Sequence, residues 1–396
     1  MIMSEPRLIL HVGAPKCGSS ALQTNLTRNP DLRDKSGRRL RYVTVRSVGP
    51  TYRTVKGAMV ARLGQSFPHG YTCWPNFGRH TDSAAILAAV QEAFRVGDKG
   101  GWVPILSCEG WINHPHHLAQ GLAALGHPPV DVVCFLRPPV EWMNAAWWQW
   151  GIWSGRSVDF WMDRMAMPYD FADHLVQWAA IPGVRLHVRR SRPDAVEKFL
   201  TLYGADIADR VAANPSAPAS LVGFMLRNRR FRETAHSAQS EFVFQRWCPV
   251  VPGKRLWGLA PQNVRLMRPV TRHARETLGR LLSEEDCRDV FADPRWTREE
   301  PYHAPIRDGR SVLNDIADLP ALYDALTEGV RNASGAVGQR MPDLPDRPTG
   351  GASIEVWDVT LAKLFDHLIA LDARFRRNPV LEIASRLSGG LMQRNV

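Results

Sequence analysis

The sequence predicts an α/β protein: a three-layer α/β/α domain with a parallel sheet, a helical second half and a C-terminal helical extension. Two observations support this prediction. Apolar runs of strand length alternate with amphipathic stretches of helix length over about the first 205 residues, as is typical of βαβ units. Beyond that point helical patterns dominate, and a segment rich in Pro, Gly and Ser precedes one last amphipathic stretch.

Five apolar runs are expected to form the sheet: 7–12, 40–45, 102–108, 130–136 and 184–189. The first and fourth are almost continuously apolar, as expected of strands covered on both faces. A helical pattern containing Leu22 and Leu26 follows the first run. Further helices are expected over 82–96, with Asp82 as N-cap, and over 115–125, 141–150 and 194–203.

Three segments complete the predicted organisation. Residues 46–82 lack periodicity and are expected to form a long surface excursion near the site. One α/β domain is placed over 1–331, with a helical subregion from about 205, followed by a linker over 332–353. Residues 354–396 are predicted to be a helical arm. Its apolar stripe and arginines suggest docking on a second copy of the chain or an anionic membrane, with packing on the parent domain as the alternative.

The composition bears on partners and compartment. A net charge of +11 and a pI near 9.7 favour an anionic partner. Nucleic acid is disfavoured, because no RRM, KH or zinc-finger signature is present. The six cysteines form no CxxC pair, no signal peptide is evident, and no apolar window approaches the roughly 20 residues of a membrane span. We therefore expect a cytoplasmic protein with reduced thiols.

The most informative motif is GAPKCGSS, at residues 13–20, between the first strand and its helix. Such a loop offers free backbone N–H groups and the helix dipole to an anion. Lys16 adds a mobile charge, and Ser19 and Ser20 add hydroxyl donors. The order differs from the kinase pattern GxxxxGK[ST], because Lys16 precedes Gly18 by two residues.

This loop resembles the 5′-phosphosulfate loop of the sulfotransferase superfamily, usually written PKxG[TS][TS]. The wider run LHVGAPKCGSSALQ is similar to bacterial carbohydrate sulfotransferases, which favour HxGxPKTGTTxLQ. The resemblance covers about residues 7–205 and implies a P-loop-like fold that uses 3′-phosphoadenosine 5′-phosphosulfate as donor. It assigns the donor loop to these residues: Pro15, Lys16, Cys17, Gly18, Ser19 and Ser20.

The same family holds the 3′-phosphate with an Arg at a strand end and a Ser about eight residues later. The run from Val132 through Arg137 to Glu141 is similar to the family's LRDPVER pattern, so Arg137 takes this role by position. Its planar fork suits bidentate phosphate contacts. Ala145 stands where the Ser is expected, and we predict that the neighbouring Asn144 amide donates instead.

Sulfuryl transfer requires alignment of the reactants, charge stabilisation on the leaving oxygen and a proton acceptor. Lys16 suits the second role. Glu109 ends a predicted buried strand, where ligands bind in parallel sheets, and bacterial family members show a similar SSE motif. We predict Glu109 as general base, with a loop-ordering carboxylate as the alternative. His114, His116 and His117 are candidates for the same role, but their spacing is not that of a zinc site, which favours a solvated loop. His11 is predicted to be a satisfied histidine near the core.

Tryptophans concentrate between residues 142 and 161. Helix packing is the ordinary explanation for such a cluster, and an aromatic wall for a sugar ring or apolar acceptor is the functional one. Tyr52, Tyr71 and Trp74 are candidates for an opposite wall.

The predicted activity is transfer of a sulfuryl group to a hydroxyl, on a carbohydrate or glycolipid, with no metal because Lys, Arg and amides supply the charge. One alternative is a P-loop small-molecule kinase, which the missing GK[ST] disfavours. Another is a non-enzymatic basic protein that binds a nucleotide or nucleic acid.

Overall fold

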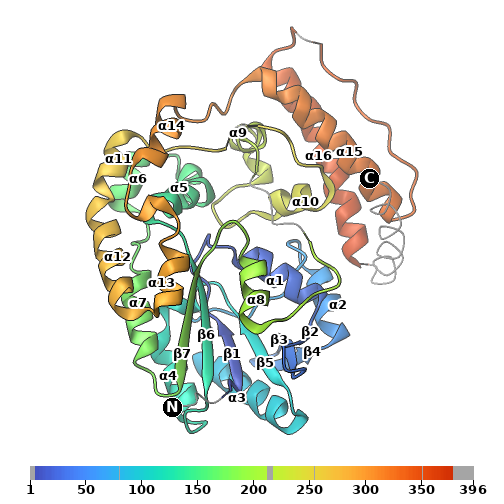
Figure 1. Cartoon of the computed structure of the whole chain (residues 1–396). Helices are drawn as coiled ribbons and strands as arrows, with labels where there is room; N and C mark the ends of the chain where they lie inside the picture. Colours follow the sequence, from blue (N-terminus) through green and yellow to red (C-terminus); the bar gives the residue numbers. More distant parts are fainter. Residues whose placement is uncertain (1–4, 80, 212–216, 254, 350, 378–396) are drawn as a thin grey trace.

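The computed structural model describes residues 5–79, 81–211, 217–253, 255–349 and 351–377. At its centre lies a seven-stranded sheet (Figure 1) in the order β2-β3-β5-β1-β6-β7, with β4 paired to β3. The strands are β1 (Leu8–His11), β2 (Asp31–Arg33), β3 (Arg39–Val48), β4 (Thr51–Lys56), β5 (Val103–Ser107), β6 (Val130–Leu136) and β7 (Val184–Arg190). β3, β5, β1, β6 and β7 are parallel, and β2 and β4 run antiparallel to β3. The predicted parallel sheet is confirmed.

Helices cover both faces of the sheet, as the three-layer prediction requires. On one face α1 (Ser19–Arg28) packs against α2 (Ala58–Ser66) and α8 (Ala195–Tyr203). On the other, α4 (Pro115–Ala123) packs against α3 (Ser83–Gly100) and α7 (Phe171–Ala179). Asp82 caps α3 as predicted, accepting hydrogen bonds from the amides of Ala84 and Ala85.

The predicted excursion over 46–82 is wrong for much of its length. β3 extends to Val48, and a two-residue turn leads into the antiparallel partner β4, which α2 follows. Gly49 opens the turn at a φ of 58°, the left-handed conformation that short hairpin turns need. A Gly-containing two-residue turn between β-branched runs was a readable hairpin signal.

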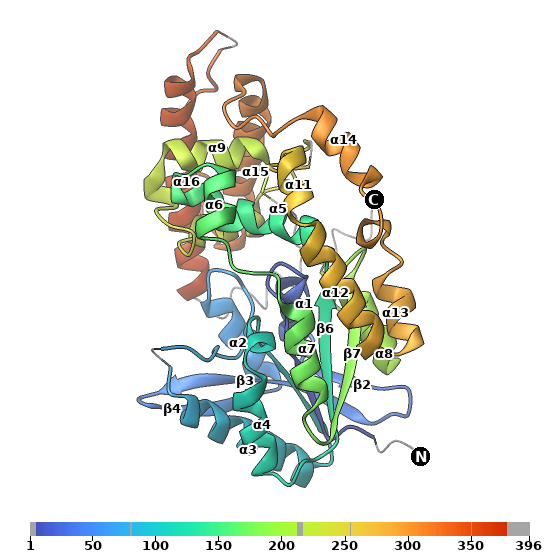
Figure 2. The ribbon, with the colours of Figure 1, turned by 90° about the vertical axis from the view of Figure 1, so that its left-hand side faces the viewer.

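Helices dominate the second half of the chain, as predicted. They are α5 (Pro139–Gln149), α6 (Val158–Arg164), α9 (Ala219–Arg227), α10 (Gln239–Trp247), α11 (Pro261–Leu266), α12 (Arg268–Leu281), α13 (Glu284–Val290), α14 (Glu300–Asp308), α15 (Leu319–Ala336) and α16 (Ile354–Arg377). Most of them lie beyond the carboxyl ends of the strands, as both views show (Figures 1 and 2). They thereby form a helical roof over the edge of the sheet that can bind ligands.

The helix α16 packs on its own chain, against α15, α10 and α2. Its stripe residues Trp357, Leu361, Leu364 and Leu368 are buried in a second hydrophobic cluster. The expectation that this stripe docks on a partner or a membrane is therefore corrected, because the parent chain already covers it. Residues 378–396 of the predicted arm lie outside the described residues, and α15 continues to Ala336, inside the predicted linker. No helix in the described ranges is long and apolar enough to cross a membrane.

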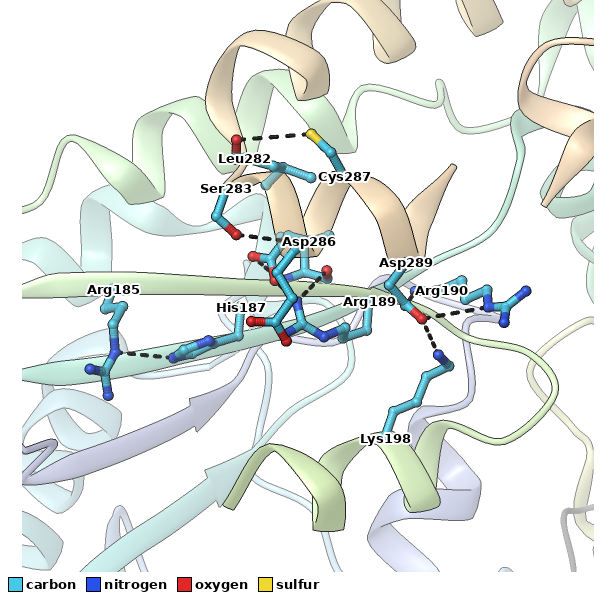
Figure 3. A network of polar contacts seen from close by, with 12 residues as sticks. Arg185, His187, Arg189, Arg190, Lys198, Leu282, Ser283, Asp286, Cys287 and Asp289 are labelled. Carbon is cyan, nitrogen blue, oxygen red and sulfur yellow. Dashed lines mark hydrogen bonds and ion pairs between the residues drawn. The ribbon is translucent and has the colours of Figure 1, made fainter. Parts of the chain in front are cut away.

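The last strand of the sheet, β7, has its free edge covered by α13 (Figure 3). The amide of Val188 donates to the Asp286 carboxylate at 3.3 Å, and the amide of Arg190 donates to Asp289 at 2.8 Å. Asp289 also pairs with Lys198 of α8. These bonds satisfy edge amides that no neighbouring strand reaches, and they fix the segment after α13, which enters the site.

Candidate functional site

A cavity of about 710 Å³ lies between the carboxyl ends of the central strands and the helical roof. The loops after β1, β5, β6 and β7 all reach it, because parallel strands end on the same side of the sheet. Seven basic side chains line it: Lys16, Arg137, Arg190, Arg192, Arg232, Arg255 and Arg295. Four acidic side chains also line it: Glu109, Asp194, Glu241 and Asp293. The excess of positive charge makes the cavity suited to an anion.

The loop after β1 is bent into an unusual backbone conformation. Lys16 has a φ of 60°, which is rare for a residue other than glycine, and Gly18 has a φ of 97° at the N-cap of α1. Neighbouring elements hold this bend. The Trp142 indole donates to the Pro15 carbonyl at 2.8 Å, and the amide of Gly110 donates to the Gly13 carbonyl at 2.9 Å. The loop is therefore preorganised by the chain itself.

The Lys16 ammonium enters the cavity and donates to the Gln149 side-chain oxygen at 3.0 Å. No carboxylate among the described residues lies within ion-pair distance of it. Burial lowers the pKa of Lys16, although the charges of Glu241 and Glu109 oppose this shift. A half-buried ammonium that faces only a neutral amide is ready to interact with an anionic ligand.

The other loop residues divide into two groups. Gly18, Ser19 and Ser20 line the cavity, and the Ser19 hydroxyl is buried without a hydrogen-bond partner in the described structure. A Cβ at Gly13 would lie 2.2 Å from that hydroxyl, so only glycine leaves it room. Pro15 and Cys17, by contrast, do not line the cavity. Cys17 is buried in the core, where burial raises its thiol pKa to about 12. Their predicted contacts with the donor are corrected accordingly.

Glu109 follows β5 and faces the same cavity. Its carboxylate accepts a hydrogen bond from the Lys16 amide at 3.4 Å, which helps to hold the strained loop. Burial raises the pKa of Glu109, while the nearby Lys16 and Arg137 act in the opposite direction. The structure thus brings the two predicted catalytic residues together. It also gives Glu109 the loop-ordering contact that was its alternative explanation.

Arg137 follows β6, lines the cavity and donates to the Ser191 hydroxyl at 3.2 Å. The Tyr169 hydroxyl donates to the Arg137 carbonyl at 2.6 Å and fixes the strand end. Burial lowers the pKa of Arg137, and burial together with the charge of Arg137 lowers the pKa of Arg192 to about 10. Neither guanidinium is ion-paired with a carboxylate in the described parts of the chain.

Ser191 and Arg192 were missed by the sequence analysis. They follow β7 directly, one residue beyond the end of the predicted strand 184–189, and the rule that led to Glu109 would have found them. Ser191 supplies beside Arg137 the hydroxyl that is missing at Ala145.

The prediction for Asn144 is corrected. Its amide nitrogen donates to the Leu256 carbonyl at 3.0 Å, and its oxygen accepts from the Gly258 amide at 2.9 Å. Asn144 is buried and holds the 256–258 segment against α5. Asn144 also lines the cavity, but the backbone of that segment already bonds both the nitrogen and the oxygen of the amide, which gives the side chain a structural role.

The helical roof contributes cations that already have partners. Arg232 is 2% exposed, pairs with Glu241 and donates to the Gln149 carbonyl at 2.9 Å. Its guanidinium also lies over the Trp153 ring, 4.2 Å from the centroid. No local signal in the sequence marks Arg232, because its partners lie on α5, η2 (Gly151–Ser154) and α10.

A second roof pairing joins segments far apart in the chain. Glu141 of α5 is 4% exposed and pairs with Arg255, and the Arg295 guanidinium lies 3.3 Å from the same carboxylate. This cluster fixes the loops at 255 and 295 over the cavity.

The tryptophan cluster is mostly core. Trp142, Trp147 and Trp161 are buried in the main hydrophobic cluster, as the ordinary explanation predicted. Trp148 lines the cavity, and its indole N–H is buried without a hydrogen-bond partner in the described structure. The predicted opposite wall is wrong, because the side chains of Tyr52, Tyr71 and Trp74 do not line this cavity. Tyr71 contacts the loop instead, its hydroxyl 3.1 Å from that of Ser20.

The histidines differ from expectation. His11 is buried, with Nδ1 2.7 Å from the Ser107 hydroxyl, but its Nε2 has no hydrogen-bond partner in the described structure. Burial lowers its pKa to about 3. His114, His116 and His117 do not line the cavity. They form a cluster in which one ring nitrogen from each histidine lies within 4.8 Å of the others.

Comparisons with known proteins add little. No family model and no curated protein matches this chain. Among solved structures, a sulfotransferase from Alicyclobacillus acidocaldarius is similar at a TM-score of 0.32 and 16% sequence identity, over 74% of this chain and 100% of that chain. A TM-score of this size does not establish a common fold, so the function proposed next rests on the residues of the cavity.

Proposed function

We propose that the cavity binds 3′-phosphoadenosine 5′-phosphosulfate and that the protein transfers its sulfuryl group to an acceptor hydroxyl. One observation carries the proposal. Lys16, Arg137 and Arg192 line one cavity, and none of them has a carboxylate partner among the described residues. Lys16 and Arg137 are half-buried and Arg192 is exposed, and their like charges repel one another unless a ligand supplies negative charge.

The residues fit a donor with two phosphate groups. The amides and hydroxyls of Gly18, Ser19 and Ser20 would hold the 5′-phosphosulfate at the start of α1. The unpartnered Ser19 hydroxyl supports this assignment. Arg137 and Ser191 would hold the 3′-phosphate.

The chain also supplies the groups that the transfer needs. The acceptor oxygen bonds to sulfur as the bond from sulfur to the bridging phosphate oxygen breaks. Lys16 would offset the charge that develops on that oxygen, and Glu109 would take the proton of the acceptor hydroxyl. The acceptor class, a carbohydrate or glycolipid, follows from the resemblance of the loop. The unpartnered Trp148 indole in the cavity wall is compatible with it.

The test compares nucleotides and then acceptors. Calorimetry is expected to show tight binding of 3′-phosphoadenosine 5′-phosphate and much weaker binding of ADP and ATP. Radiolabelled donor is then incubated with a panel of sugars and glycolipids. Equal or tighter binding of ATP would favour the kinase alternative, and tight product binding without any transfer would favour the non-enzymatic one.

A further inference from the structure

Three imidazoles gather at the start of α4, away from the cavity. His114 is the N-cap residue of the helix, and His116 and His117 lie in its first turn. Their ring nitrogens lie within 4.8 Å of one another. Pro115 fixes the backbone between them at the first helical position, where proline is best tolerated.

The three rings have no competing polar role. None of their nitrogens is hydrogen-bonded to another described residue. Phe77, which is buried, stacks on the His117 ring at a centroid distance of 4.6 Å and an interplanar angle of 18°. Packing therefore orients one ring, and the exposed His116 keeps the cluster open to solvent.

The donor atoms of the cluster fit one class of metal ion better than others. Neutral imidazole is the form that binds a metal ion. In the absence of a carboxylate in the cluster, imidazole nitrogen favours a transition metal over Mg²⁺ or Ca²⁺, which prefer oxygen.

We infer that His114, His116 and His117 bind one divalent transition-metal ion, of the class of Zn²⁺, and leave its fourth position open. Three nitrogens within 4.8 Å can meet one ion at about 2.0–2.1 Å after small side-chain rotations. None of the three histidines lines the donor cavity, so this site is independent of the proposed sulfuryl transfer.

The experiment is titration calorimetry of tag-free full-length protein with ZnCl₂, because a histidine tag would bind the ion itself. Wild type is expected to take up one Zn²⁺ per chain at this site, and His116→Ala is expected to lower the affinity at least ~10-fold. His303→Ala, at an exposed histidine on α14, is the matched control and is expected to bind as wild type does. MgCl₂ is expected to give no saturable heat.

Melting curves provide a second measurement. Zn²⁺ is expected to raise the melting temperature of wild type and of His303→Ala, and to leave that of His116→Ala unchanged, because a ligand stabilises the fold that binds it. The exposed His116 can be replaced without creating a cavity, so the variant is expected to fold. Absence of saturable Zn²⁺ uptake by wild type, or unchanged affinity in His116→Ala, would overturn the inference.

Discussion

The two walls of the cavity are built on different principles. On the strand wall, the sheet topology brings together Lys16, Glu109, Arg137 and Ser191, each in the loop that follows a parallel strand. On the roof, Arg232 is held by the Glu241 carboxylate, and Arg255 and Arg295 are held by that of Glu141, which lies more than a hundred residues earlier. Only the strand wall has cations without acidic partners among the described residues. The difference suggests that one wall binds the ligand and the other holds the roof in place.

The largest expected effect tests the structural role of the roof. Replacing Arg232 by Met removes a nearly fully buried guanidinium and leaves Glu241 without its partner. We expect the free energy of unfolding to fall by about 3–5 kcal/mol, the usual consequence of breaking a buried pair. Urea denaturation measures the loss. Arg230→Met, at an exposed ion pair with Asp366, is the control and is expected to cost less than about 1 kcal/mol.

A substitution on the strand wall should lower the turnover rate. Replacing Lys16 by Ala is expected to lower the rate of sulfuryl transfer by about 10²–10³-fold, as removal of one transition-state donor does. Nucleotide affinity should fall much less, because the lysine charge matters most when charge develops on the bridging oxygen. Single-turnover kinetics and calorimetry separate the two effects. Lys99→Ala, at an exposed position on α3, is the control. A rate loss fully explained by weaker nucleotide binding would contradict this role.

A substitution at Glu109 distinguishes a catalytic role of this carboxylate from a role in supporting the loop. Glu109→Gln keeps the shape and an acceptor for the Lys16 amide but cannot take a proton. We expect a rate at least ~10²-fold lower with normal nucleotide affinity.

The pH profile supplies a second readout for Glu109. Burial raises the pKa of this carboxyl, so the active, deprotonated form should accumulate as pH rises through a value above the ordinary range for Glu. Activity of wild type should therefore increase across that limb, and the limb should be absent from Glu109→Gln. Loss of nucleotide binding in the variant would instead assign Glu109 to the support of the loop.

A substitution at Arg137 tests whether the cations without acidic partners bind the ligand. Arg137→Met is expected to weaken binding of 3′-phosphoadenosine 5′-phosphate by about 1.5–3 kcal/mol, the range for hydrogen bonds to charged groups. Binding of adenosine 5′-phosphosulfate, which lacks the 3′-phosphate, should change little. An equal loss for both nucleotides would show that Arg137 does not recognise the 3′-phosphate.

The smallest expected effect separates the roles of two polar residues that line the cavity. Ser191→Ala should weaken binding of the same product by about 1 kcal/mol. Asn144→Ala should leave affinity nearly unchanged and lower stability by about 1–3 kcal/mol, because it leaves backbone groups of the 256–258 segment unsatisfied. The reverse pattern would restore the sequence-based assignment of Asn144.

The two walls also explain what the sequence could predict. Residues of the strand wall follow apolar runs. The resemblance of two motifs indicated Lys16 and Arg137, and the rule for the carboxyl ends of parallel strands indicated Glu109. Ser191 was within reach of the same rule. The roof could not be predicted. The pairing of Glu141 with Arg255 and Arg295 depends on the tertiary arrangement that brings α5 next to the loops at 255 and 295. Asn144 was misassigned for the same reason, since its partners lie more than a hundred residues away.

The cover that α13 gives to β7 has a consequence for the behaviour of the protein in concentrated solution. An outer strand with free amides can recruit a strand from another molecule, which is a common start of aggregation. Here Asp286 and Asp289 occupy the amides of Val188 and Arg190. Detachment of α13 would therefore expose an unpaired strand edge. It would also free the segment after α13, which lines the cavity. The carboxylates of this short helix therefore close this edge of the folded sheet to pairing with another strand.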